Sequence, residues 1–234
     1  MQRVHYSEDH LAFANLVRDF AAKEVAPHIV YWEHEGRIPR EVFARAGALG
    51  LLGFATAPEY GGLGTDDYRY NQILIEEFMD ADCGGVGLSF AVHNDICLPY
   101  LADLTNDEQK QRWLPGFVSG RLIAAIGMTE PGAGSDVVGI RTTAVDHGDH
   151  FLVNGAKTFI TNGQNADLVI TAVRTSPDRH HGLSLLVMER GLAGFERGRN
   201  LDKLGLHCQD TSELVFSDVR VPKANLLGEA GAGF

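Results

Sequence analysis

Ten residues near the middle of the chain, residues 127–136 with the sequence GMTEPGAGSD, gather hydroxyls, glycines and carboxylates in one short segment. They follow the apolar run 122–126 and precede an alternating stretch, so we expect a loop here. Gly132 and Gly134 would let the backbone approach a bulky ligand closely, and successive backbone N–H groups can form an anion-binding concavity. A phosphate site, a metal site, a reactive serine and a structural turn all have to be considered.

Motif spacing excludes several of these chemistries. A dinucleotide-binding Gly-x-Gly-x-x-Gly that starts at Gly132 would need a third glycine where Val137 stands. A serine-hydrolase elbow centred on Ser135 would need glycine in place of Ala133 and Val137. The Gly-Lys-Ser/Thr of a P-loop is absent, and no His-x-x-x-His pair indicates a catalytic zinc site. A ligand-binding loop and a structural turn remain as alternatives.

A second segment, residues 155–163 with the sequence GAKTFITNG, favours the ligand-binding alternative. Side chains alternate along a strand, so Phe159 and Thr161 should share one face. An aromatic plane with a hydroxyl two residues away suits a flat ring system that accepts hydrogen bonds. The alternative is a core phenylalanine beside a threonine at the rim.

The first part of the chain must position these segments with helices. From Ser7 to about Val118 apolar residues recur at helical spacing, and Ser7 precedes two acids as an N-cap should. We expect the first helix to end near Pro27. Further helices are predicted at residues 40–49, 67–79, 86–93 and 107–117, with a shorter one at 96–101.

After Gly120 the pattern changes to short strands. They are predicted at residues 140–145, 151–153, 157–161, 168–174, 183–188 and 213–216, with a turn at 146–149 and a hairpin signal at Asn154-Gly155. This spacing is typical of a sandwich or barrel and not of alternating β-α-β units. The predicted fold is therefore α+β and multidomain, with an all-helical domain over residues 1–120 and an all-β domain over residues 121–234.

Composition narrows the class of protein. The net charge of −11 argues against nucleic acid and anionic membranes as partners, and no apolar run approaches the roughly 20 residues of a membrane-spanning helix. Residues 1–120 carry 18 acidic and 9 basic side chains, whereas residues 121–234 carry 13 and 11. Three separated cysteines indicate free thiols, and no signal-peptide pattern is visible at the N-terminus. We therefore expect a soluble cytoplasmic protein.

Taken together, residues 128–136 and 157–163 resemble the flavin-binding segments of the acyl-CoA dehydrogenase family. Residues 203–222 look like the closing segment of that family's β domain, and residues 225–229 follow it as expected. The resemblance covers essentially the whole chain. The sequence of residues 209–213, QDTSE, is most similar to that of the family's long-chain branch.

The resemblance implies FAD as the cofactor and assigns residues to it. Phe159 stands where many relatives have tryptophan. Ser135 lies where the family's loop meets both FAD and acyl-CoA, and His180 and His181 match a region that touches CoA, although an exposed loop is an equal alternative for the two histidines. The residues implied for FAD are Ile126, Met128, Thr129, Gly134, Ser135, Phe159, Ile160 and Thr161.

A small basic cluster, Arg197, Arg199 and Lys203, lies in the nearly neutral part of the sequence. Arginine forms charge-assisted hydrogen bonds with phosphate, so the cluster could meet the phosphates of CoA. A solvated basic face is the alternative.

The family's reaction implies α-proton removal from a fatty acyl-CoA by a glutamate, with hydride transfer to FAD and a trans-2-enoyl-CoA product. The resemblance places that base beyond Phe234, in a helical domain that would follow; Glu130 belongs to the loop motif and is not the base. We therefore expect a truncated chain without catalytic or metal-binding residues, whose complete form is a homotetramer that passes electrons to an electron-transfer flavoprotein. An acyl-CoA oxidase, a flavin-dependent hydroxylase and a non-catalytic acyl-CoA- or flavin-binding module remain alternatives.

Overall fold

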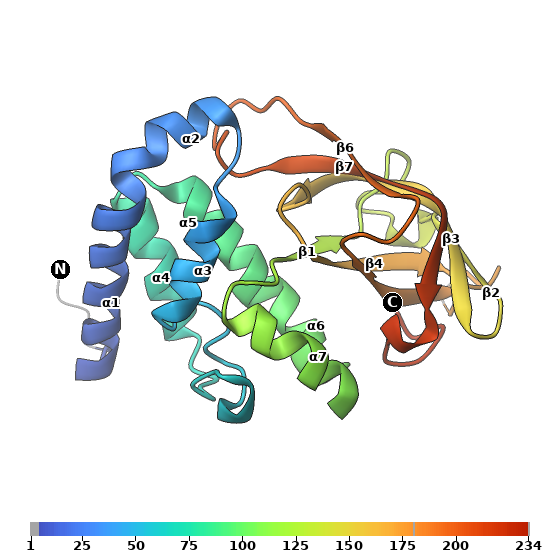
Figure 1. Ribbon diagram of the computed structural model, residues 1–234, viewed down its shortest axis with the longest axis horizontal. Helices are drawn as coiled ribbons and strands as arrows, with labels where there is room; N and C mark the ends of the chain where they lie inside the picture. The colour runs from blue at the N-terminus through green and yellow to red at the C-terminus, as the bar shows by residue number, and fades with distance from the viewer. Residues whose placement is uncertain (1–4, 180, 234) are drawn as a thin grey trace.

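The structure is a computed structural model that describes residues 5–179 and 181–233, with a helical region followed by a β region (Figure 1). This order confirms the predicted fold class. The helices are α1 (Glu8–Phe20), α2 (Ile29–Glu35), α3 (Arg40–Ala48), α4 (Arg69–Asp80), α5 (Gly84–Ala91), α6 (Leu98–Asp103) and α7 (Asp107–Val118). None of the described helices is long and apolar enough to cross a membrane.

Helix α1 begins as predicted, but the chain stays helical past Pro27. The Ser7 hydroxyl accepts a hydrogen bond from the backbone N–H of His10, and the His10 side chain pairs with the backbone N–H of Ser7. A π turn (Ala21–Val25) and a 3₁₀ turn (Ala26–His28) then lead directly into α2. Pro27 lies in the first turn of the 3₁₀ segment, where a missing N–H costs little, so the predicted helix end was wrong.

The predicted helices at 86–93 and 96–101 form one continuous helical segment. A π segment (Val92–Cys97) joins α5 to α6, and Pro99 falls in the first turn of α6. Such π turns accommodate an irregular hydrogen-bond ladder inside a helix, which is why this proline does not end the segment.

The β region is a single folded sheet in the order β6-β7-β3-β2-β4-β5-β8, with β1 parallel to β4. Strands β4 and β5 are buried on both faces: one face packs on α7, and the other packs on β3 and β7. The two halves of the sheet therefore enclose a core as a sandwich does. The strands are β1 (Ala124–Gly127), β2 (Thr143–Asp146), β3 (His150–Thr161), β4 (Leu168–Arg174), β5 (Leu183–Glu189), β6 (Phe195–Asn200), β7 (Thr211–Pro222) and β8 (Leu226–Leu227).

Asn154 and Gly155 do not form the predicted hairpin turn. They lie inside β3, at a register shift against β7, and Gly155 has φ +149°. A Cβ at Gly155 would lie 2.5 Å from Oγ1 of Thr142, so the close approach of the neighbouring chain requires glycine there. The hairpin is made instead by residues 146–149, as predicted, and it joins β2 to β3.

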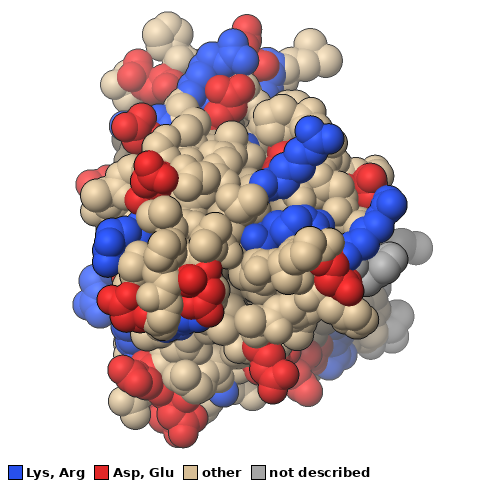
Figure 2. Space-filling model, turned by 90° about the vertical axis from the view of Figure 1, so that its right-hand side faces the viewer, with Lys and Arg blue, Asp and Glu red and all other residues tan. Residues whose placement is uncertain are grey.

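The outer end of the β region carries both signs of charge. Figure 2 shows acidic and basic side chains intermixed over this face, without a continuous basic patch. The distribution agrees with the nearly balanced charge of residues 121–234.

Candidate cofactor site

The loop at 127–136 and strand β3 lie side by side. The backbone N–H of Thr158 donates to the carbonyl of Thr129 at 2.9 Å, and Nζ of Lys157 donates to the carbonyl of Met128 at 3.0 Å. These contacts join segments that are about thirty residues apart in sequence, and they place Thr129 beside Thr158, three residues before Thr161.

A buried ion pair fixes the loop on the strand. Nζ of Lys157 lies 2.8 Å from Oε1 of Glu130, and the two side chains are 0% and 6% exposed. The Glu130 carboxylate also accepts from the backbone N–H groups of Arg141 at 2.7 Å and Thr142 at 2.9 Å. Burial alone would raise the pKa of Glu130, but the hydrogen bonds from Lys157, Thr142 and Arg141 outweigh it and lower the pKa. Glu130 is therefore a charged structural anchor and a poor general base.

Burial acts in the opposite direction on Lys157. It lowers the pKa of Lys157, and the ion pair with Glu130 offsets only part of that effect. Because Glu130 receives several donors and stays ionised, we assign the pair as an ion pair.

Phe159 is presented outward by an irregular backbone. It has φ +59°, lies at a second register shift between β3 and β7, and is 66% exposed. A bulky residue with positive φ is strained, and such strain persists where the surrounding structure enforces it, often at a functional site. Thr161 is partly buried, on the other side of Ile160. Phe159 and Thr161 are thus both more exposed than Ile160, which lies between them in the core. A bulge between Lys157 and Ile160 interrupts the regular alternation that the sequence predicted.

Ile160 differs from its expected role. Its side chain is 2% exposed and belongs to the core between the two halves of the sheet, so it cannot pack beside a flavin. Only its backbone atoms are left to meet a ligand there.

The remaining loop residues leave space and unused hydrogen-bonding groups. Ile126 and Met128 are partly buried against the core that includes α7, whereas Gly134 and Ser135 are exposed. A Cβ at Gly134 would meet no atom within 4 Å. Within residues 5–179 and 181–233, the hydroxyls of Thr129, Ser135 and Thr161 have no hydrogen-bond partner. An exposed ring on β3, together with the hydroxyls and open backbone of the loop that contacts this strand, fits a flat, polar-edged group such as an isoalloxazine.

The predicted CoA-contacting residues receive less support. His180 lies outside the described residues. His181 is exposed, and its backbone N–H donates to Oδ1 of Asp178 at 2.6 Å.

The basic cluster is mostly used inside the protein. Arg197 donates to the carbonyls of Gly163 and Ala166, and its burial lowers its pKa to about 10. Lys203 donates to the carbonyls of Leu206 and Gln209. Arg199 remains at the surface, 3.9 Å from Glu213. Arg197 and Lys203 therefore support backbone turns, and the contact of this cluster with CoA phosphates stays a prediction.

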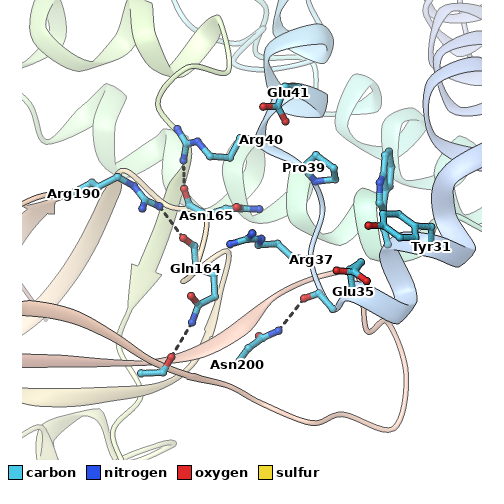
Figure 3. Close-up of a pocket in the computed structure, with 13 residues that line it drawn as sticks. Tyr31, Glu35, Arg37, Pro39, Arg40, Glu41, Gln164, Asn165, Arg190 and Asn200 are labelled. Carbon is cyan, nitrogen blue, oxygen red and sulfur yellow. Dashed lines mark hydrogen bonds between the residues drawn. The ribbon is translucent and has the colours of Figure 1, made fainter.

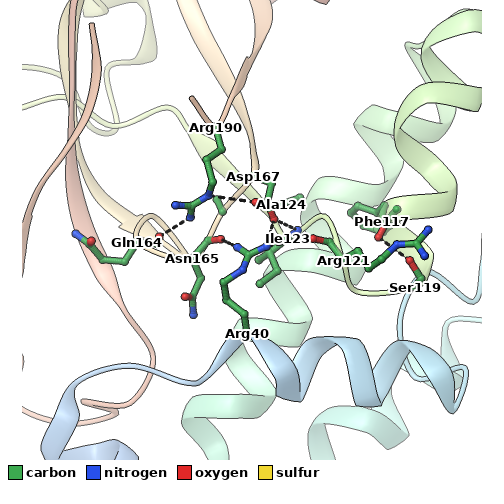
Figure 4. A network of polar contacts seen from close by, with 12 residues as sticks. Arg40, Phe117, Ser119, Arg121, Ile123, Ala124, Gln164, Asn165, Asp167 and Arg190 are labelled. Atoms are coloured by element: carbon green, nitrogen blue, oxygen red, sulfur yellow. Dashed lines mark hydrogen bonds and ion pairs between the residues drawn. The ribbon is translucent and has the colours of Figure 1, made fainter. Parts of the chain in front are cut away.

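Two features beside the site had no signal in the sequence. One is a polar network around Arg40, Asp167 and Arg190 (Figure 4). The other is an open cleft of about 640 Å³ between the α2–α3 segment and the turn after β3, into which Arg37 points (Figure 3). Both depend on residues far apart in the chain, so no local motif marks them.

No group of three or more metal-ligating side chains occurs in the part of the chain that the structure describes. The site's chemistry is thus that of hydrogen-bond donors, one aromatic ring and a buried ion pair.

Comparison with known families agrees with this geometry. Residues 7–121 match the model of the acyl-CoA dehydrogenase N-terminal domain, and residues 125–219 match that of the middle domain. The chain belongs to the acyl-CoA dehydrogenase family.

Individual relatives extend the comparison. The long-chain specific acyl-CoA dehydrogenase of Sus scrofa mitochondria is 44% identical over 98% of this chain and 53% of its own length. The crystal structure of acyl-CoA dehydrogenase from Geobacillus kaustophilus superposes with a TM-score of 0.95 at 49% identity, over 100% of this chain and 61% of that one. A Bacillus anthracis acyl-CoA dehydrogenase, solved in complex with FAD, superposes with a TM-score of 0.90 at 34% identity, over 100% of this chain and 40% of that one. The chain thus spans about half the length of the curated long-chain relatives it matches.

Proposed function

We propose that this chain forms the FAD- and thioester-binding part of an enzyme that dehydrogenates fatty acyl-CoA to trans-2-enoyl-CoA. The observation that carries the proposal is the convergence of the loop at 127–136 with β3, the strand that carries the exposed Phe159 ring. Membership of the family, and FAD in the similar Bacillus anthracis structure, support the same assignment.

Each part of the site has a proposed task. FAD, when bound, supplies the hydride-accepting chemistry. Phe159 offers its ring to the flavin, while Thr129 and Thr161 donate hydrogen bonds to the flavin's polar edge. Ser135, at the exposed end of the loop, borders both cofactor and thioester.

The proton-abstracting base is proposed to come from sequence outside these 234 residues. Glu130 cannot serve, because it is held ionised and enclosed by Lys157 and two backbone N–H groups. A base needs a raised pKa and access to the substrate, and Glu130 has neither.

The wider setting is proposed from the family resemblance. It comprises a long-chain fatty acyl substrate, an electron-transfer flavoprotein as acceptor, a homotetramer and a cytoplasmic location. The three buried free thiols are compatible with a reducing compartment.

Anaerobic mixing of the FAD-loaded full-length protein with a long-chain acyl-CoA tests the function, since the proposed base lies outside residues 1–234. Bleaching of the flavin absorption band is the expected result, because the flavin becomes reduced. A spectral shift without bleaching would identify a binding module and refute dehydrogenation. Admission of oxygen to the reduced protein, with oxygen consumption measured, separates an oxidase from a dehydrogenase.

A further inference from the structure

The turn between β3 and β4, residues 162–167, follows directly on Thr161 and is held by arginines. The carbonyls of four successive residues, 163–166, accept hydrogen bonds from guanidinium groups. Arg197 donates to Gly163 (3.0 Å) and Ala166 (2.7 Å). Arg190 donates to Gln164 (2.7 Å), and Arg40 donates to Asn165. Outward-facing carbonyls favour cations, so this turn is fixed by charge as well as by its own backbone.

Asp167 connects this turn to the start of β1. Its Oδ2 accepts from the backbone N–H of Ile123 at 2.8 Å and from Nη2 of Arg40 at 2.7 Å, and its Oδ1 accepts from Nε of Arg190 at 3.1 Å. The backbone N–H of Asp167 donates in return to the carbonyl of Ile123 at 2.7 Å. The side chain is 12% exposed, so water screens these contacts little.

Ile123 lies three residues before Ile126, and the turn begins one residue after Thr161. The Asp167 carboxylate therefore adds to the β1–β4 backbone pairing in holding the start of β1 against the turn that follows β3.

Arg40 brings the helical region into the same arrangement. It is the first residue of α3, and it contacts Asn165, Asp167 and the carbonyl of Arg121, the last at 3.1 Å (Figure 4). The planar fork of one guanidinium serves three acceptors from two stretches of chain, which a lysine ammonium cannot reproduce.

From this geometry we infer that Arg40 and Asp167 are positioning residues of the flavin site. They hold the start of β1 and the turn after β3 at a fixed spacing, so that Thr129 and Thr161 face one ligand. The flavin part of this inference rests on the proposed function, whereas the coupling of the two segments does not.

Hydrogen–deuterium exchange on the native protein without added FAD tests the coupling. Arg40→Gln should speed exchange about tenfold in residues 123–129 and 158–168 together, because both segments lose their shared anchor. Arg45→Gln is the matched control: Arg45 lies on the same helix, is 51% exposed and pairs with Glu24 at the surface. It should leave both segments unchanged. If Arg40→Gln fails to fold, Arg40→Lys and Asp167→Asn replace it.

FAD titration by flavin fluorescence provides the second reading. Arg40→Gln and Asp167→Asn should weaken FAD binding about tenfold, with a shifted flavin absorption band, while Arg45→Gln binds like the native protein. Unchanged exchange, faster exchange everywhere, or faster exchange in only one segment would overturn the positioning role. Native protein that binds no FAD would instead refute the proposed function and the flavin part of the inference, while the exchange contrast still decides the coupling.

Discussion

Two parts of the candidate site are stabilised in different ways: the loop at 127–136, and β3 with the turn at 162–167 that follows it. The loop at 127–136 has one buried ion pair, Glu130–Lys157, and beyond it mostly exposed residues with open space around Gly132 and Gly134. In the turn at 162–167, arginine guanidinium groups bond four of the six backbone carbonyls. One side of the site is therefore rigid: β3, which carries Phe159 and Thr161, with the turn that follows it. The other side, the loop at 127–136, can adapt to a ligand. Rigid elements supply the precise geometry, and loops supply the fit.

The largest expected effect is the loss of the loop's buried ion pair. Lys157→Met should reduce the free energy of unfolding by about 3–5 kcal/mol, because it leaves the Glu130 carboxylate buried without its cation. Denaturant unfolding measures it. Lys23→Met is the control, since Lys23 pairs with Asp19 at the surface and both side chains are more than two-thirds exposed. The double variant Lys157→Met/Glu130→Gln should recover part of the loss, and a double variant no better than the single one would contradict this role.

On β3, Phe159→Ala should weaken FAD binding by about 0.5–1.5 kcal/mol, because the aromatic contact with the flavin is lost. Phe159→Trp should bind as well as the native protein. Unfolding of the cofactor-free protein should be little affected, because the ring is 66% exposed. Phe159→Gly should stabilise that form, since glycine adopts φ +59° without strain, and would show the cost of presenting the ring.

Stability should also depend on pH through two buried groups with opposite signs. Burial lowers the pKa of His93 to about 3, so between about pH 3 and 6.5 the unfolded chain binds the extra proton and stability rises with pH. Burial raises the pKa of Asp210 to about 6, so between about pH 4 and 6 the folded chain binds the extra proton and stability falls with rising pH. Between about pH 4 and 6 the two contributions have opposite signs, so Asp210 should offset part of the rise due to His93 there.

Variants separate the two contributions. Asp210→Asn should steepen the rise, and His93→Gln should flatten or reverse it, as measured by thermal unfolding at a series of pH values. Identical slopes in all three proteins would show that neither group titrates as burial predicts.

The smallest effect is expected at the surface of the β region. Arg199→Ala should change acyl-CoA affinity less than about twofold. Its side chain is 74% exposed and forms only a long contact of 3.9 Å with Glu213, and charges so exposed to water contribute little. Calorimetric titration measures the affinity. A tenfold loss would restore the idea that this arginine meets a CoA phosphate.

Sequence patterns predicted the features that depend on neighbours in the chain. The Ser7 cap, the helical spacing and the turn at 146–149 are local, and they appear where expected. The errors occurred where tertiary contacts decide. Pro27 and Pro99 were accommodated by 3₁₀ and π turns, and Gly155 permits a close approach of Thr142 inside a strand.

For the site, motifs identified the loop and the strand but not what holds them. Ile160 is buried because a bulge shifts the strand, and a bulge has no reliable local pattern. Arg40 and Asp167 are 127 positions apart, so their contact follows only from the packed fold.

A crystal structure of the native protein grown with FAD tests the central claim most directly. We expect the isoalloxazine against the Phe159 ring, with hydrogen bonds from the hydroxyls of Thr129 and Thr161. A flavin bound elsewhere, for example in the cleft beside Arg37, with both hydroxyls left in solvent, would contradict the account.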